Sequence, residues 1–223
     1  MNRFTNRTAT VIATVLLVAT GALAVADAPV TLDSIEPAPL SAAEEAGILF
    51  MREEEKLARD VYLELAELWN VRVFENIARS EQQHMDNMLA LIDRYDLEDP
   101  ALTPGVFTNP ELQALYDSLI DQGEESIEEA LRVGALIEEV DIEDLVLDMA
   151  EADNEDIQVI YGSLLAASEN HLRAFVSQID RYGVDYEPSV LSQEEYEAIV
   201  NSDSSASRGG GNGARAQGRG RRI

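Results

Sequence analysis

Apolar residues recur three or four positions apart through most of residues 41–183, and this spacing is typical of helices that bury one face. Almost no stretch alternates apolar and polar residues as a half-buried strand does. Proline and glycine lie mainly between the periodic stretches, where they favour helix ends. The pattern therefore predicts an all-α domain with four long helices, at about 41–69, 73–95, 124–149 and 153–182.

The ends of these helices carry their own signals. Ser41–Glu44 has the spacing of a capping box, and Gly183 suits a left-handed stop after the last helix. Between the second and third helices, residues 96–123 form a connection longer than most loops, with a short helix predicted to begin after Asn109. Such a length permits a crossover, so we expect two helical hairpins that pack as a four-helix bundle.

The segments outside the bundle predict an exported protein. Residues 1–26 have the arginines, apolar run and small-residue cleavage motif of a signal peptide, and we expect cleavage after Ala26. The alternative is an uncleaved anchor, but the apolar run is shorter than the roughly 20 residues that span a bilayer. We expect a secreted, periplasmic or cell-surface protein with no stable membrane insertion after cleavage. A linker (27–40) precedes the bundle, and an extension with a short helix (184–200) and a disordered Gly- and Arg-rich tail (201–223) follow it.

Charge and composition narrow the partners. Residues 27–202 contain 42 Asp and Glu against 9 Lys and Arg, an excess that repels nucleic acid and anionic lipid. A surface this acidic and poor in lysine would repel itself unless salt screened it, which indicates a host living at high salt. The absence of cysteine excludes disulfides and cysteine-ligated iron–sulfur clusters. The Arg-rich tail leaves self-association into a homo-oligomer open.

The chain has only two histidines, and both fall on apolar stripes of predicted helices. His84 lies three residues after Glu81, so the imidazole and the carboxylate share one helix face and can reach one ion. His171 has Ser168 at the corresponding position. A buried metal site is the first hypothesis.

The apolar stripes place six metal-ligating side chains in one inner layer. The apolar stripe of the first predicted helix (about 41–69) includes Glu54 and is expected to run on to Leu68. Carboxylates combined with imidazoles favour iron or manganese over calcium or magnesium, with zinc as an alternative. Burying these charges without a cation would cost several kcal/mol per ion, as an order of magnitude. The predicted ligands are Glu54, Glu81, His84, Glu138, Asp141 and His171.

Other interpretations of these residues stay open, because acids are common in this chain. Glu54 lies between Glu53 and Glu55, so these residues could form a charged face, and Glu138 competes with Glu139. The histidines could be hydrogen-bonded core residues instead of ligands.

Four blocks of the sequence resemble a ferritin-like family called domain of unknown function 2202. The blocks are Met51–Asp60, Phe74–His84, Gly134–Asp144 and Asn170–Phe175, and the resemblance covers about residues 41–183. It implies the fold of the ferritin-like di-iron carboxylate proteins, with a long crossover between the second and third helices. It also implies a metal site, but no assigned reaction.

This chain departs from the ferritin-like pattern in its fourth helix, where that pattern has Glu-x-x-His. Ser168 replaces the glutamate and removes one bridging carboxylate. Asp141 could replace that ligand from the neighbouring helix, or the second metal position is weak or empty.

A pair of iron or manganese ions at such a site predicts oxidase chemistry. A ferrous pair with an open coordination position can reduce dioxygen or peroxide, and Fe²⁺ itself would be the reductant, so we expect a ferroxidase or a peroxide scavenger. Glu81 would bridge the ions, His84 and His171 would be terminal donors, and Glu54 and Glu138 terminal or shifting carboxylates. The alternatives are a non-catalytic metal-binding or interaction module with one structural ion, and a metal-free bundle.

Overall fold

The computed structural model describes residues 32–202, and within them it contains six α-helices, one short 3₁₀ helix (Leu32–Ser34) and no strand. The all-α prediction is confirmed. The helices belong to a unit that begins at Ile35, and the 3₁₀ helix belongs to a separate one. The expected signal peptide (1–26), the start of the linker and the tail from residue 203 lie outside the described residues.

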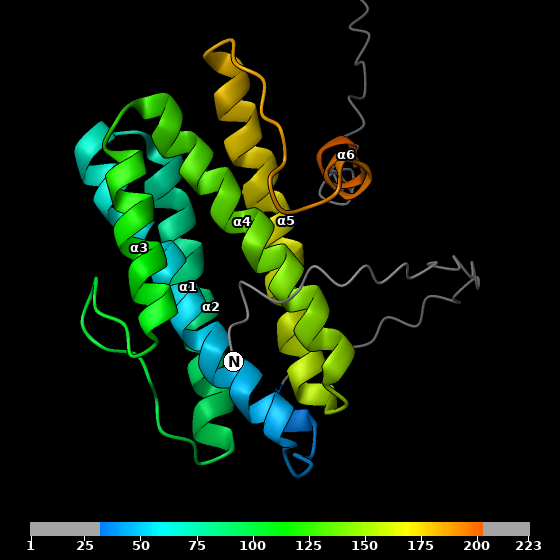
Figure 1. Cartoon of the computed structure of the whole chain (residues 1–223). Coiled ribbons are helices and arrows are strands. Elements are labelled where there is room, and N and C mark those ends of the chain that lie inside the picture. Colours follow the sequence, from blue (N-terminus) through cyan, green and yellow to red (C-terminus); the bar gives the residue numbers. More distant parts are fainter. Residues whose placement is uncertain (1–31, 203–223) are drawn as a thin grey trace, which may run out of the picture. The chain divides into compact units, whose positions relative to one another are not determined.

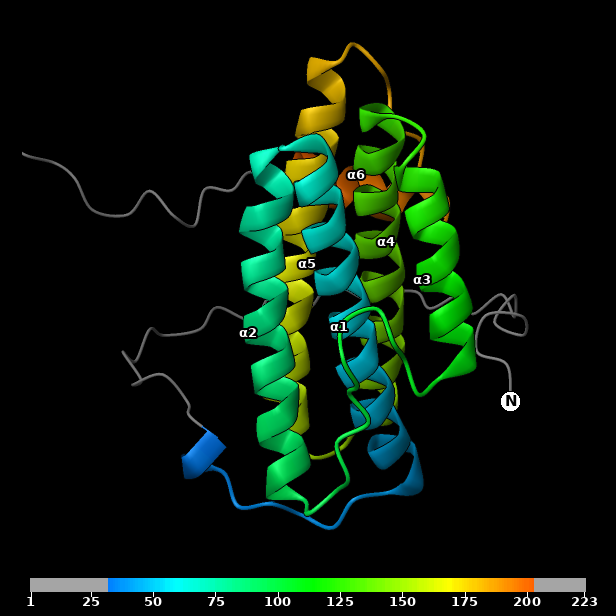
Figure 2. The ribbon, with the colours of Figure 1, turned by 90° about the vertical axis from the view of Figure 1, so that its left-hand side faces the viewer.

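Four long helices form two hairpins (Figures 1 and 2). In the first, α1 (Ala42–Trp69) lies along α2 (Arg72–Arg94), with Asn70 in the left-handed conformation at the turn. In the second, α4 (Ile127–Glu151) lies along α5 (Glu155–Arg181). The hairpins meet where α1 contacts α4 and α2 contacts α5, so all four helices surround one interior.

Two shorter helices complete the fold. Helix α3 (Pro110–Gly123) lies in the connection between the hairpins and packs on α1 and α4, and α6 (Gln193–Asn201) packs on α5. The predicted capping box at Ser41 and the predicted helix start after Asn109 are both present, and Ser192 caps α6 with a second capping box. Among residues 32–202, no helix is both long and apolar enough to cross a membrane.

The predictions differ from the structure at two points. The third long helix was expected from about Glu124, but α4 begins at Ile127 because the side chain of Ser126 accepts from the backbone N–H of Glu129. Leu68, expected inside, is 50% exposed. The inward position after Leu65 falls instead at Trp69, whose indole N–H donates to the carbonyl of Gly123 at 2.8 Å.

An aromatic cluster fills one part of the interior. The ring centroids of Tyr62 and Phe175 are 5.2 Å apart, and those of Phe74 and Phe175 are 5.6 Å apart. Gly134 allows α4 to approach this cluster, since a Cβ there would lie 2.4 Å from the Phe175 ring. The neighbouring layer of the bundle is polar.

Buried carboxylates at the periphery hold the connections in place. Glu53 accepts from the backbone N–H groups of Thr108 (2.6 Å) and Asn109 (3.1 Å), so it fixes the start of α3. Glu139 accepts from three consecutive N–H groups of residues 189–191, which fixes the C-terminal extension to α4. Each of these acids therefore has a structural partner that satisfies its charge.

The only lysine of the chain has a similar role. Lys56 is fully buried and forms an ion pair with Asp60 (2.7 Å), while its ammonium lies 3.9 Å from the centre of the Phe107 ring. Asp60 also accepts from the N–H of Gly105 at 2.9 Å. The long connection, which runs beside α1 in Figure 2, is thus held on the outer face of that helix.

Candidate metal centre

The two histidines meet inside the bundle although they are 87 positions apart in sequence. Their rings stack with centroids 5.6 Å apart, one from α2 and the other from α5. Both are buried, at 6% and 9% exposure. The predicted convergence of His84 and His171 is therefore found in the structure.

Glu81 lies between the two imidazoles. Its Oε2 is 2.7 Å from Nδ1 of His84, and its Oε1 is 2.9 Å from Nδ1 of His171. The second contact is not aligned as a hydrogen bond, since neither Glu81 Oε1 nor His171 Nδ1 has a hydrogen-bond partner among residues 32–202. One carboxylate thus spans both histidines, as a bridging ligand would.

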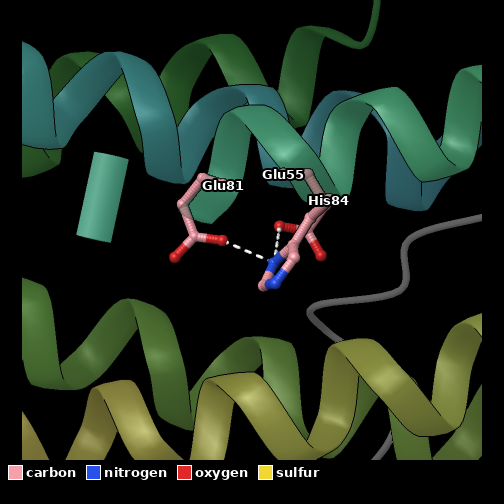
Figure 3. Close-up of side chains that lie close together, drawn as sticks. All are labelled: Glu55, Glu81 and His84. Atoms are coloured by element: carbon pink, nitrogen blue, oxygen red, sulfur yellow. Dashed lines mark hydrogen bonds and ion pairs between the residues drawn. The ribbon is translucent and has the colours of Figure 1, made fainter. Parts of the chain in front are cut away.

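Glu55 completes a group around His84 (Figure 3). Its Oε2 lies 3.1 Å from His84 Nδ1. Glu55, Glu81 and His84 each offer one possible ligand atom, and these three atoms lie within 4.8 Å of one another. All three residues are buried. We did not predict Glu55 as a ligand, because the apolar stripe of the first helix pointed to Glu54.

Glu138 completes a matching group around His171. Its Oε2 lies 3.4 Å from His171 Nδ1, and its Oε1 accepts a hydrogen bond from the Tyr62 hydroxyl at 2.6 Å. Glu81, Glu138 and His171 again offer ligand atoms within 4.8 Å of one another. Glu138, predicted in preference to Glu139, therefore faces the centre, while Glu139 holds the C-terminal extension.

The other two predicted ligands lie outside both groups. Asp141 accepts a hydrogen bond from Ser168 through Oδ2, while its Oδ1 has no partner among the described residues. Glu54 is 4% exposed, and neither of its carboxylate oxygens has a hydrogen-bond partner in that part of the chain. Whether Glu54 and Asp141 bind a metal stays a prediction.

Proton affinities at the centre reflect this concentration of charge. Burial would raise the pKa of Glu81, but the imidazoles of His171 and His84 outweigh it and lower that pKa to about 2. Burial also works against protonated imidazoles, yet the carboxylates of Glu55 and Glu138 raise the pKa of His84 to about 11 and of His171 to about 10. Without metal, both imidazoles are therefore protonated at neutral pH.

The surrounding acids shift the other way. Burial, with repulsion from neighbouring carboxylates, raises the pKa of both Glu54 and Glu55 well above the usual range. Burial and the charge of Glu138 raise the pKa of Asp141 to about 7. The raised pKa values favour protonation of these buried carboxyl groups, and protons would thus take the place of a bound cation in the metal-free protein.

Comparison with known proteins agrees with the family resemblance. A family model described as "Uncharacterized protein domain (DUF2202)" matches residues 44–203. The chain belongs to this family. One relative, "Uncharacterized protein MJ0754" of Methanocaldococcus jannaschii, is 46% identical over 173 residues. These residues cover 77% of this chain and 94% of the relative.

A solved structure is also similar. It is the crystal structure of hypothetical protein MJ0754 from Methanococcus jannaschii, at 47% identity and a TM-score of 0.74. The match covers 76% of this chain and 98% of that one. The similarity therefore extends over nearly the whole length of that protein.

Proposed function

We propose that the bundle binds two transition-metal ions through the two ligand groups that share Glu81. One ion would be held by Glu55, Glu81 and His84, and the other by Glu81, Glu138 and His171. The observation that carries this proposal is the position of Glu81, whose two oxygens lie 2.7 and 2.9 Å from the two imidazoles. Shared carboxylates of this kind are how helical bundles hold a pair of ions.

The chemistry of the donors fits a cation better than a metal-free interior. Within the described part of the chain, Glu54, Glu55 and Asp141 each keep at least one buried oxygen without a hydrogen-bond partner, although buried carboxylates ordinarily find hydrogen-bond donors. The acids at the periphery, such as Glu53 and Glu139, do find donors. A divalent ion would neutralise the central acids, and neutral imidazoles would bind it in place of protons.

We propose on this basis that the fold belongs to the ferritin-like superfamily. Each long helix contributes to the two groups: Glu55 from α1, Glu81 and His84 from α2, Glu138 from α4, and His171 from α5. The segment between α2 and α4, which contains α3, would then be the long crossover of that fold.

Iron or manganese is the metal that we propose, with zinc as the alternative, because the set mixes hard carboxylate oxygens with imidazole nitrogens. A bound ferrous pair would supply electrons to dioxygen or peroxide, which makes a ferroxidase or peroxide scavenger the proposed activity. The chain's own contribution is to fix the ions and exclude water. The hydrogen bond from Tyr62 to Glu138 holds one oxygen of that carboxylate and leaves the other facing His171.

A second candidate function has one observation in its favour. Ser168 stands where a fourth-helix carboxylate would bind, and it holds one oxygen of Asp141. If Asp141 does not replace the missing ligand, the site would hold a single structural ion without turnover.

The two candidates differ in a direct assay. Metal-free protein is mixed anaerobically with two equivalents of Fe²⁺, and oxygen or peroxide is then added while its consumption and ferric absorbance are followed. The oxidase proposal predicts oxidation faster than in buffer, lost in His84→Ala. Oxidation at the buffer rate, together with tight binding of one zinc ion per chain, would instead support the single-ion module.

A further inference from the structure

The C-terminal extension, which begins at residue 184, turns back along the α4–α5 hairpin and leads into α6 (Figure 1). It is packed against the bundle, since Tyr196 is buried in the hydrophobic core and Leu191 and Ile199 lie against that core. The rings of Tyr186 and Tyr196 also contact each other, with centroids 6.0 Å apart. The extension is therefore part of the packed unit that surrounds the candidate metal centre.

On α4 the extension is bound by Glu139, which directly follows the proposed ligand Glu138. Oε2 of Glu139 lies 3.0, 2.8 and 2.9 Å from the backbone nitrogens of residues 189–191, and Oε1 accepts a hydrogen bond from the Tyr186 hydroxyl. Glu139 is fully buried. Because adjacent residues of a helix point about 100° apart, these bonds hold α4 in the rotation that directs Glu138 inward.

On α5 the extension is bound by Arg173, two residues after the proposed ligand His171. Its Nη1 donates to the carbonyl of Ile199 at 2.8 Å and to the hydroxyl of Ser202 at 3.0 Å. Its Nη2 donates to Oδ1 of Asn170 at 2.8 Å. Since positions two apart on a helix point about 200° apart, Arg173 holds the side of α5 that is opposite to His171.

Both attachments lie beside the same ligand group. Glu138 and His171 belong to the group on α4 and α5 that shares Glu81, whereas Glu55 and His84 of the other group lie on α1 and α2. Oε2 of Glu138 is 3.4 Å from Nδ1 of His171. A metal site requires its ligands to be held within about 0.5 Å and 10–20° of the binding geometry, so the rotations of α4 and α5 matter most for this group.

We propose that the C-terminal extension is a brace that orients Glu138 and His171 through two positioning residues. These are Glu139 on α4 and Arg173 on α5. The extension connects the two helices from outside and fixes their rotations at the level of one ligand group. Where it concerns metal affinity, this inference rests on the proposed function, but the orientation of His171 can be measured without metal.

The brace variants are Glu139→Gln, which removes the charge that three N–H groups share, and Arg173→Gln, a milder change at a partly exposed position. Glu44 offers a matched control, because it is also a buried carboxylate that accepts from two consecutive N–H groups, those of Asp153 (3.1 Å) and Asn154 (3.0 Å). It lies eleven residues before Glu55, a rise of about 16 Å along the helix. Glu44→Gln should therefore lower stability without altering either ligand group, and thermal melting compares the stabilities.

The first test is NMR of the histidine ring signals in the metal-free full chain. The chain has only two histidines, and each belongs to a different ligand group, so His84→Ala identifies the signals of His171. We expect both brace variants to shift the His171 signals more than the His84 signals, and Glu44→Gln to shift neither. Equal shifts of the two histidines in the brace variants, or no shift, would overturn the brace.

The second test is titration of the same full-length variants with Co²⁺ alone, followed by its visible absorption. We expect the brace variants to bind one of the two ions at least about tenfold more weakly, as loss of a group that orients a ligand does, and the other ion as in the wild type. Equal weakening of both ions would reflect lost stability alone and would contradict the brace. If the wild type takes up no Co²⁺, the proposed function fails, while the histidine signals still decide whether the extension orients His171.

Discussion

Glu81 and His171 come from helices of different hairpins, yet Glu81 Oε1 lies 2.9 Å from His171 Nδ1. Because the other Glu81 oxygen contacts His84, this one carboxylate connects the two ligand groups. The contact also spans the interface between the hairpins. A substitution at Glu81 therefore tests both metal positions at once.

We expect Glu81→Gln to lower the bound metal from two ions to one or fewer per chain. The amide keeps the shape, but its NH₂ group cannot bind metal and its carbonyl cannot bridge two ions with full charge. Elemental analysis after equilibrium dialysis measures the content. Glu75→Gln, at an exposed position on the same helix, is the matched control and should retain the wild-type value. If Glu81→Gln bound as much metal as the wild type, the proposal that both ligand groups share Glu81 would be wrong.

Glu54 and Glu55 separate two kinds of acid on α1. Glu55 lies 3.1 Å from His84, whereas burial and then the charges of Asp144 and Asp141 on α4 raise the pKa of Glu54. We therefore expect Glu55→Gln to weaken equilibrium binding of one ion by at least about tenfold, close to the effect of losing one metal-supporting interaction. Glu54→Gln should change equilibrium affinity less. Competition with a chelator of known affinity measures both, and the reverse order would assign the ligand role to Glu54.

The neighbouring residues Glu54 and Glu55 also show how far the sequence could predict the site. Spacing along each helix was enough to find Glu81, His84, Glu138 and His171, because a stripe of buried residues fixes which side of a helix faces inward. It could not separate Glu54 from Glu55, since adjacent residues lie about 100° apart and both positions are buried where α1 faces α2 on one side and α4 on the other. One signal in the sequence could have included Glu55. Three consecutive residues of a helix point in different directions, so Glu53, Glu54 and Glu55 must each have a different partner if the helix is buried on most sides.

The helices and their ends could be predicted more fully than the ligand set, because their signals lie between residues that are close together in the sequence. Caps such as Ser41 and Ser192 act through contacts within one turn, so their sequence signals are local. The prediction for Leu68 was wrong, because at this end of α1 it is Trp69 that packs inward while Leu68 is 50% exposed. The contact of Trp69 with Gly123 is a tertiary one, which no local pattern contains.

Metal-free protein should become less stable as the pH rises from about 4.5 to 11. Several groups have a folded pKa above the unfolded one, including Asp141 at about 7, His171 at about 10 and His84 at about 11, with Glu54 and Glu55 also raised. Such groups add stability that is complete below the unfolded pKa and is lost as the pH passes the folded pKa. Urea unfolding in chelator at pH 5 and pH 8.5 measures it.

Two further results bear on that prediction. Glu81, with its pKa lowered to about 2, contributes stability above its unfolded pKa that is lost as the pH falls below about 4.5, so the metal-free optimum should lie near pH 5. Metal should reverse the trend, because its ligands must lose their protons before it binds. Higher stability at pH 8.5 than at pH 5 in the metal-free protein would contradict the protonated interior.

Gly134 tests the packing beside the centre. We expect Gly134→Ala to destabilise the fold by about 1–3 kcal/mol, the usual cost of an overpacked core, because its Cβ would meet the Phe175 ring at 2.4 Å. Gly162→Ala is the control, since a Cβ there lies 3.8 Å from the nearest atom, a methionine methyl. Chemical denaturation should show that the control is neutral or stabilising, by up to about 1 kcal/mol as expected for alanine in a helix. Equal stabilities of the two variants would contradict the close approach of α4 to the aromatic cluster.

The central claim is that this buried layer of carboxylates and imidazoles holds two transition-metal ions. Equilibrium dialysis of the full chain against Fe²⁺ or Mn²⁺ under anaerobic conditions, followed by elemental analysis, measures this most directly. The account predicts two ions per chain, with proton release as the imidazoles become neutral. Protein that binds no transition metal, and whose His84→Ala variant has the same metal content, would contradict it.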